Sequence, residues 1–90
     1  MKDIPVKDDD LEGLSLKLNG TDWEALARRL KFQDPEITAF DKENEEYPKK
    51  ALKMLFQWKR RDGSKATYRV LHAALSHEFV KRGDLAEKFC

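Results

Sequence analysis

The chain has 90 residues, which is enough for one domain with one hydrophobic core and too short for several domains. Charged residues make up 39% of it, but 18 Lys and Arg nearly balance 17 Asp and Glu, which disfavours a dedicated nucleic-acid binder with its large basic excess. No apolar run approaches the roughly 20 residues of a membrane span, and the single cysteine, Cys90, excludes an internal disulfide.

The first predicted element is a helix over residues 8–18. Its inward face consists of leucines at helical spacing, namely Leu11, Leu14 and Leu18. The aspartates at its start, Asp8, Asp9 and Asp10, suit the positive end of the helix dipole. Gly13 lowers helix stability by up to about 1 kcal/mol relative to alanine, so we expect the helix to be bent or frayed before it ends at Asn19-Gly20.

The second and third helices are predicted from residue 22 to about 31 and from Asp34 onward. The second has an apolar face formed by Trp23, Leu26, Ala27 and Leu30. Thr21 and Glu24 have capping-box spacing at its start. In the third, Asp34 can cap the helix, and Pro35 loses no hydrogen bond at the first helical position. The inward residues expected there are Ile37 and Phe40.

The fourth helix is predicted to begin at Pro48. Its inward face consists of Ala51, Met54, Leu55 and Trp58, and we expect both tryptophans of the chain to lie in the core. Leu52 and Phe56 fall off this face on a helical wheel. Leu52 is interpreted as a core residue, whereas Phe56 is either an exposed anchor for a partner or packed under the first or sixth helix.

The last two helices follow a turn at Asp62-Gly63-Ser64. The fifth is predicted over residues 65–80, with Leu71, Ala74, Leu75 and either Tyr68 or Phe79 buried. Gly83 breaks the chain, and Asp84 with Glu87 repeats the capping-box spacing before a short sixth helix through Leu85 and Phe89. Six short amphipathic helices with short connections predict an all-α, six-helix antiparallel bundle.

Several blocks of these helices resemble the death domain. The second helix carries W-x-x-L-A-x-x-L, and the family's further blocks follow in order at Asp34-Pro35-Glu36-Ile37, at Ala51 to Trp58, at Ala66-Thr67 to Leu75 and at Asp84-Leu85-Ala86-Glu87. The segment 58–67 is most similar to the ankyrin-type and adaptor-type branches. The resemblance implies the death fold and the binding of other death domains in apoptotic or inflammatory (NF-kappaB-type) signalling, through asymmetric surfaces that propagate head to tail.

Charge is separated by region, as expected of a binding domain that selects its partners electrostatically. The basic residues are predicted to form an interaction patch consisting of Lys49, Lys50, Lys53, Lys59, Arg60 and Arg61, with Arg28 and Arg29 on the second helix. The acidic patch consists of Asp8, Asp9, Asp10, Asp41, Glu43, Glu45 and Glu46. The hypothesis is that the basic fourth helix docks on an acidic patch of a neighbouring domain, and that reversing Lys49, Lys50 and Arg60 abolishes binding. The alternative is that these charges are ordinary solvated helix faces.

Other classes of function have weaker support. An enzyme is not expected, because His72 and His77 lie on different faces of one helix and no Ser or Cys lies in a nucleophile motif. No metal, cofactor or small-molecule substrate is expected either, since the glycines are isolated and Cys90 has no second cysteine beside it. A nucleic-acid-binding helical domain and a passive structural domain of a receptor or scaffold stay open as alternatives, although we expect no nucleic-acid partner.

The expected setting is the cytoplasm, or the cytoplasmic portion of a membrane protein, because one thiol gives an oxidising compartment nothing to crosslink. The expected partners are other death-domain proteins, with a second copy of this chain as a further candidate. We expect residues 1–90 to be a single domain cut from a longer multidomain protein, without membrane contact of its own.

Overall fold

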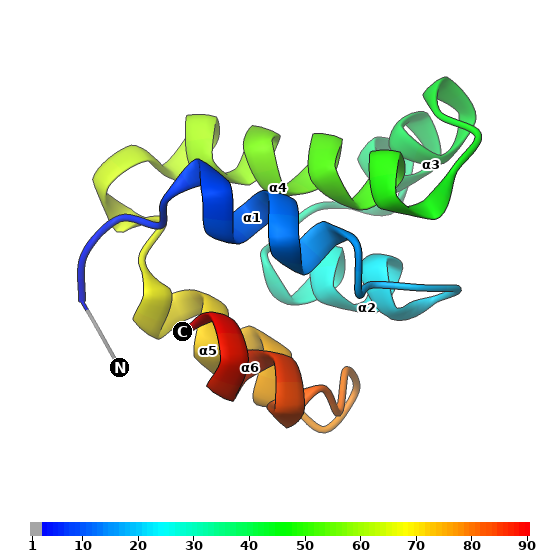
Figure 1. The fold of residues 1–90 in the computed structure, drawn as a ribbon. Helices are drawn as coiled ribbons and strands as arrows, with labels where there is room; N and C mark the ends of the chain where they lie inside the picture. Colours follow the sequence, from blue (N-terminus) through cyan, green and yellow to red (C-terminus); the bar gives the residue numbers. More distant parts are fainter. Residues whose placement is uncertain (1–2) are drawn as a thin grey trace.

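Six α-helices form the part of the chain that the structure describes, residues 3–90 of a computed structural model (Figure 1). They are α1 (Asp8–Ser15), α2 (Asp22–Arg29), α3 (Asp34–Glu43), α4 (Tyr47–Asp62), α5 (Tyr68–Ser76) and α6 (Gly83–Phe89). A 3₁₀ turn, Gly63–Lys65, follows α4 at the predicted turn. The predicted all-α, six-helix fold is confirmed.

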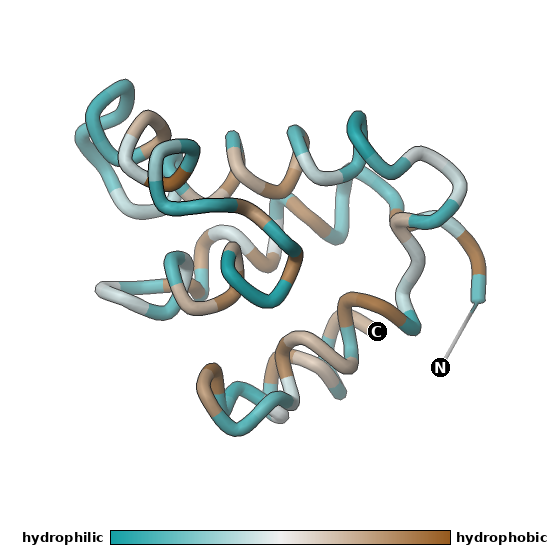
Figure 2. Tube along the Cα trace, turned by 180° about the vertical axis from the view of Figure 1, so that it is seen from behind, coloured by the Kyte–Doolittle hydropathy of each residue, from teal (hydrophilic) through white to brown (hydrophobic). Residues whose placement is uncertain are grey.

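The core lies where α1 packs on α4, α6 packs on α5, and α2 contacts both α4 and α5. Figure 1 shows α4 passing along α1, with α5 and α6 side by side on the other side of the molecule. Trp23 and Trp58 are 1% and 0% exposed, so both tryptophans are core residues as predicted. Figure 2 shows hydrophobic segments alternating with hydrophilic ones along each helix, so each helix has one apolar stripe to bury against the others.

At Gly13 the side chain of Phe89 from α6 packs against α1. A Cβ atom at this position would lie 2.8 Å from Cε1 of Phe89, closer than atoms in real contacts come. The helix is not frayed at this residue, because α1 continues through Gly13, and it ends at Ser15, before the predicted Leu18. Leu18 lies beyond the helix but is still fully buried. The glycine allows two helices to approach each other.

The predicted helix caps are mostly wrong, since capping depends on backbone conformation as well as residue spacing. Thr21 lies in a turn in which Asp22 N–H donates to the Asn19 carbonyl. Its ψ of −2° is not the extended conformation of a capping residue, and its side chain makes no capping bond. Asp84 lies inside the first turn of α6, where its carboxylate pairs with Arg82.

Two other caps form instead. At α3 the residue before the helix is Gln33, whose N–H donates to Glu36 Oε1 at 3.0 Å, and Asp34 is the first helical residue. At α5, Val70 N–H donates to Thr67 Oγ1 at 3.3 Å. Both capping residues have the extended backbone that a cap requires.

The N-terminal segment 4–7 is a feature that the sequence analysis missed. Val6 N–H donates to the Ala66 carbonyl at 2.9 Å, and Tyr68 N–H donates to the Ile4 carbonyl at 3.1 Å. This pairing accompanies an extended Thr67, so α5 begins at Tyr68 and not at the predicted Lys65. The Tyr68 hydroxyl is itself fixed, since it accepts a bond from Lys7 N–H.

Candidate interaction surface

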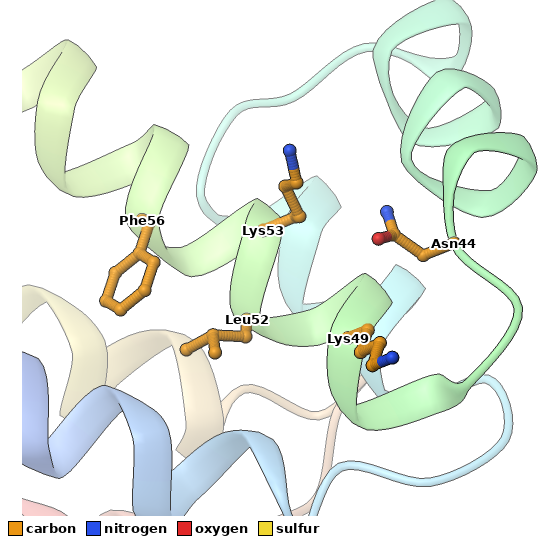
Figure 3. A pocket seen from close by; sticks show the side chains of 5 residues that line it. All are labelled: Asn44, Lys49, Leu52, Lys53 and Phe56. Carbon is orange, nitrogen blue, oxygen red and sulfur yellow. The ribbon is translucent and has the colours of Figure 1, made fainter.

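The outward side of α4 carries a hollow with apolar and basic walls. Leu52 and Phe56 are half-buried, and Phe56 packs against the core with part of its ring. Lys49 and Lys53 are exposed on either side of Leu52. Together with Asn44, just after α3, these side chains enclose about 300 Å³ (Figure 3).

Two further hollows extend this surface along the helix. One of about 400 Å³ continues past Phe56 to Gln57 and Arg60. The other, about 350 Å³, reaches from Leu52 to Leu16 at the end of α1. Residues three, four and seven apart share one side of a helix. We call this surface the α4 groove and define it by Lys49, Leu52, Lys53, Phe56 and Arg60.

Leu52 and Phe56, which fall off the inward face of α4 on a helical wheel, are both only half-buried. Leu52 was predicted as a core residue, which is wrong: it lies between the end of α1 and the 44–46 connection, and these cover it only in part. Phe56 is half-buried: it packs against the core and also lines the groove, and its role as an anchor for a partner stays a prediction. Neither side chain is a fully exposed anchor.

Four of the predicted basic patch residues are paired with carboxylates of the same domain. The pairs are Lys50–Asp41 at 2.6 Å, Lys59–Asp8 at 2.8 Å, Arg61–Asp62 at 2.8 Å and Arg28–Asp34 at 3.3 Å. Each such surface pair contributes about 0–1 kcal/mol to stability. Their charges are thus largely neutralised within the fold.

The three basic residues of the α4 groove differ from these. Lys49, Lys53 and Arg60 form no ion pair with any residue in the range 3–90. Their positive charges therefore face solvent around the half-buried Leu52 and Phe56. An apolar centre with a charged rim is the usual anatomy of a protein-binding surface.

The predicted acidic patch is divided in the same way. Asp8 and Asp41 pair with lysines of α4, and Asp10 accepts a hydrogen bond from the Tyr68 hydroxyl. Asp9 is exposed at the start of α1. The remaining residues are exposed and, within the described chain, take no part in an ion pair; we call them the acidic corner, Glu43, Glu45 and Glu46.

The structure separates Arg29 from the α4 groove. Its Nη1 lies 3.3 Å from Nε2 of His77, and its guanidinium lies 5.4 Å from the centre of the Phe79 ring. Phe79, which the sequence analysis considered for burial, is 68% exposed on the α5–α6 loop. The fifth helix was predicted to extend to Val80, which placed Phe79 on a helix. In the structure α5 ends at Ser76, so Phe79 lies in the following loop.

Two pKa shifts bear on the chemistry that the domain offers. Burial, with the nearby Asp10 and Glu87 carboxylates, raises the pKa of the Cys90 thiol to about 11, so the thiolate is scarce at neutral pH and a poor nucleophile. The hydrogen bond from Arg61 lowers the pKa of Asp62. Arg61 therefore makes its ion pair within the domain, whereas the side chain of its neighbour Arg60 is exposed and unpaired in the described range.

Within residues 3–90, no helix combines the length and the hydrophobicity that a membrane span needs. Most of the chain lies in six helices that share one core. Both tryptophans are buried in this core, and α1 and α6 are in close contact at Gly13. The family model described as the death domain matches residues 8–89, from the start of α1 to the end of α6. The chain belongs to the death-domain family.

Proposed function

We propose that the α4 groove binds an acidic surface of another death domain and that this contact assembles a signalling complex. Membership of the family implies a protein–protein interaction module in death-fold signalling. The finer part of the proposal is an adaptor role in apoptotic or inflammatory signalling, in the cytoplasm or in the cytoplasmic portion of a membrane protein. No catalytic step belongs to it.

One observation carries the proposal: Lys49, Lys53 and Arg60 surround half-buried Leu52 and Phe56 and have no acidic partner in the range 3–90. Partner carboxylates would supply the missing charge and accelerate association. Apolar side chains of the partner would cover the groove. Both contributions come from the same side of α4.

The test compares the wild-type domain with a triple charge reversal, Lys49→Glu, Lys53→Glu and Arg60→Glu. Lys50 is left unchanged, because its reversal would also break the ion pair with Asp41. Binding to a panel of purified, immobilised death domains is measured at low and physiological salt. We expect binding to weaken about tenfold or more in the triple variant, and wild-type binding to weaken as salt rises.

The matched control carries the same change of charge on other exposed lysines, Lys7→Glu, Lys17→Glu and Lys65→Glu. It should bind as the wild type does, and circular dichroism should show both variants folded. A groove variant that keeps full affinity for every partner contradicts the proposal. Absence of binding by the wild type to any death domain would instead favour the passive structural alternative.

The nucleic-acid alternative is tested in parallel with random DNA in a salt titration. A phosphate binder would lose affinity steeply as salt rises, in proportion to the number of phosphates that it neutralises. The pairing of Lys50 and Lys59 with Asp41 and Asp8 leaves fewer cations for phosphate. This supports the protein-binding proposal over the nucleic-acid one.

A further inference from the structure

Both ring nitrogens of His77 face hydrogen-bond donors. Phe79 N–H donates to Nδ1 at 3.1 Å, and Nη1 of Arg29 lies 3.3 Å from Nε2. A neutral imidazole carries one hydrogen and one lone pair on its nitrogens, so it can accept only one of these two bonds. With Nδ1 as the acceptor, the hydrogen on Nε2 faces the Arg29 guanidinium, and two donors meet without an acceptor. An anionic oxygen beside them would accept a hydrogen bond from both.

Arg29 also lacks a carboxylate for its charge. Within residues 3–90 it forms no ion pair, and its buried Nε has no hydrogen-bond partner. Its guanidinium lies 5.4 Å from the centre of the Phe79 ring, which itself lies 5.1 Å from the centre of the His77 ring. Phe79 therefore packs against both donor groups and restricts their movement. An arginine stacked on an aromatic ring is well placed to bind an anion through its planar set of donors.

Lys31, directly after α2, adds a second cation in a strained backbone conformation. Its φ is 75°, in the left-handed region where helices usually end with glycine. Its N–H donates to the Arg28 carbonyl at 3.1 Å, and Phe32 N–H donates to the Ala27 carbonyl at 3.0 Å, as at a helix end of this kind. Any residue other than glycine destabilises such a turn. The chain thus has an exposed positive side chain where glycine would be more stable.

These side chains surround a hollow of about 370 Å³ between the end of α2 and one side of α5. Val70 is 42% exposed and contributes, with two alanines, an apolar wall from α5. In the part of the chain that the structure describes, no acidic residue lines the hollow, and none of its residues belongs to the α4 groove. We call it the α2–α5 hollow; its lining residues are Arg29, Lys31, Val70, Ala73, Ala74 and His77.

We propose that the α2–α5 hollow binds a phosphotyrosine side chain of a partner protein. The phosphate carries about 1.5 to 2 negative charges and three strong acceptor oxygens, which pair with Arg29, Lys31 and His77. The aromatic ring of the same residue packs on Val70 and the two alanines. Phosphoserine meets the same donors, but it is too short to cover the apolar wall. This site goes beyond the proposed function, because it recognises a modified side chain on another face and not the surface of a death domain.

The test measures fluorescence anisotropy of labelled peptides that differ at one residue, which is phosphotyrosine, phosphoserine or tyrosine between identical neutral flanks. The wild type should bind the phosphotyrosine peptide about tenfold or more tightly than either of the others. Phenyl phosphate should displace this peptide, and in NMR spectra it should shift the amide signals of Arg29, Lys31 and Val70. A wild type that binds no phosphotyrosine peptide, or that binds phosphoserine equally well, would overturn the proposal.

Lys31→Gly distinguishes a role in binding from a role in the fold. It removes the cation and also relieves the left-handed backbone, so the midpoint of urea denaturation should rise while affinity for the phosphotyrosine peptide falls about tenfold. Arg29→Gln should lower that affinity at least as much. Val70→Ser should reduce the preference for phosphotyrosine over phosphoserine. Full affinity for the phosphotyrosine peptide in both Lys31→Gly and Arg29→Gln would overturn the proposal.

Two controls separate this site from the α4 groove, and both are measured at physiological salt, which screens distant charges. Lys65→Gln removes one exposed charge elsewhere and should bind the phosphotyrosine peptide as the wild type does. The groove triple variant, Lys49→Glu, Lys53→Glu and Arg60→Glu, should also bind this peptide normally while losing its death-domain partner. Phosphotyrosine binding lost in the groove variant and retained in Lys31→Gly would overturn the present proposal alone.

Discussion

The basic residues of α4 form two groups of equal number that use their charges differently. Lys50, Lys59 and Arg61 pair with Asp41, Asp8 and Asp62, and the first two of these pairs connect α4 to α3 and to α1. Lys49, Lys53 and Arg60 share one side of α4, form no ion pair within residues 3–90 and border the α4 groove. The difference teaches that the number of charges on a helix does not identify a binding surface, whereas their pairing within the fold does.

The neighbours Arg60 and Arg61 provide the largest contrast. The Arg61 guanidinium lies 4.6 Å from the centre of the Phe32 ring and donates to the Leu30 carbonyl and to Asp62. Arg61→Ala should therefore lower the free energy of unfolding by about 1–3 kcal/mol. Arg60→Ala should change it by less than about 0.5 kcal/mol. Urea denaturation measures both free energies of unfolding, and equal losses in the two variants would contradict the division between the paired and the unpaired basic residues.

Arg61 should also have a smaller effect on stability at acidic pH, because it sets the pKa of Asp62. The Arg61 hydrogen bond holds the pKa of Asp62 below its ordinary value of 3.8. Asp62 therefore stabilises the fold above pH 3.8, and this contribution is lost as the pH falls through the lower pKa of the folded state. In Arg61→Ala the pKa of Asp62 should rise toward 3.8, as NMR titration of its carboxyl carbon would show. Arg60→Ala serves as the control and should leave that pKa unchanged.

The fold could be predicted from the sequence because it depends on local patterns. Trp23 and Trp58 lie on apolar stripes, and a stripe with helical spacing must be buried against other helices. The packing role of Gly13 could not be predicted from its neighbours in the chain, because the ring that it contacts is that of Phe89 on α6. The cap at Thr21 failed for a similar reason, since a turn from Asn19 sets its backbone conformation.

The candidate surface could be predicted only as a set of residues. Arg60 and Arg61 are adjacent and identical, so no local signal tells which of them packs on Phe32. Lys59 pairs with Asp8, which is 51 residues away in the chain. Phe79 was hidden by a helix predicted too long. Ion pairs between distant segments therefore decide which charged side chains stay unpaired and available to a partner. Such ion pairs depend on how the helices pack.

The smallest expected effect comes from Lys53, where one substitution should raise stability and weaken partner binding. Lys49 and Lys53 are four residues apart on the outward side of α4, with no carboxylate paired to either in the range 3–90, so their like charges repel. Lys53→Gln should therefore raise the free energy of unfolding by about 0.2–0.5 kcal/mol and at the same time weaken partner binding. Lys50→Gln, which breaks the pair with Asp41, should instead lower stability slightly. If Lys53→Gln lowered stability and left binding intact, Lys53 would belong with the paired basic residues of α4, and the contrast between the paired and unpaired groups would fail.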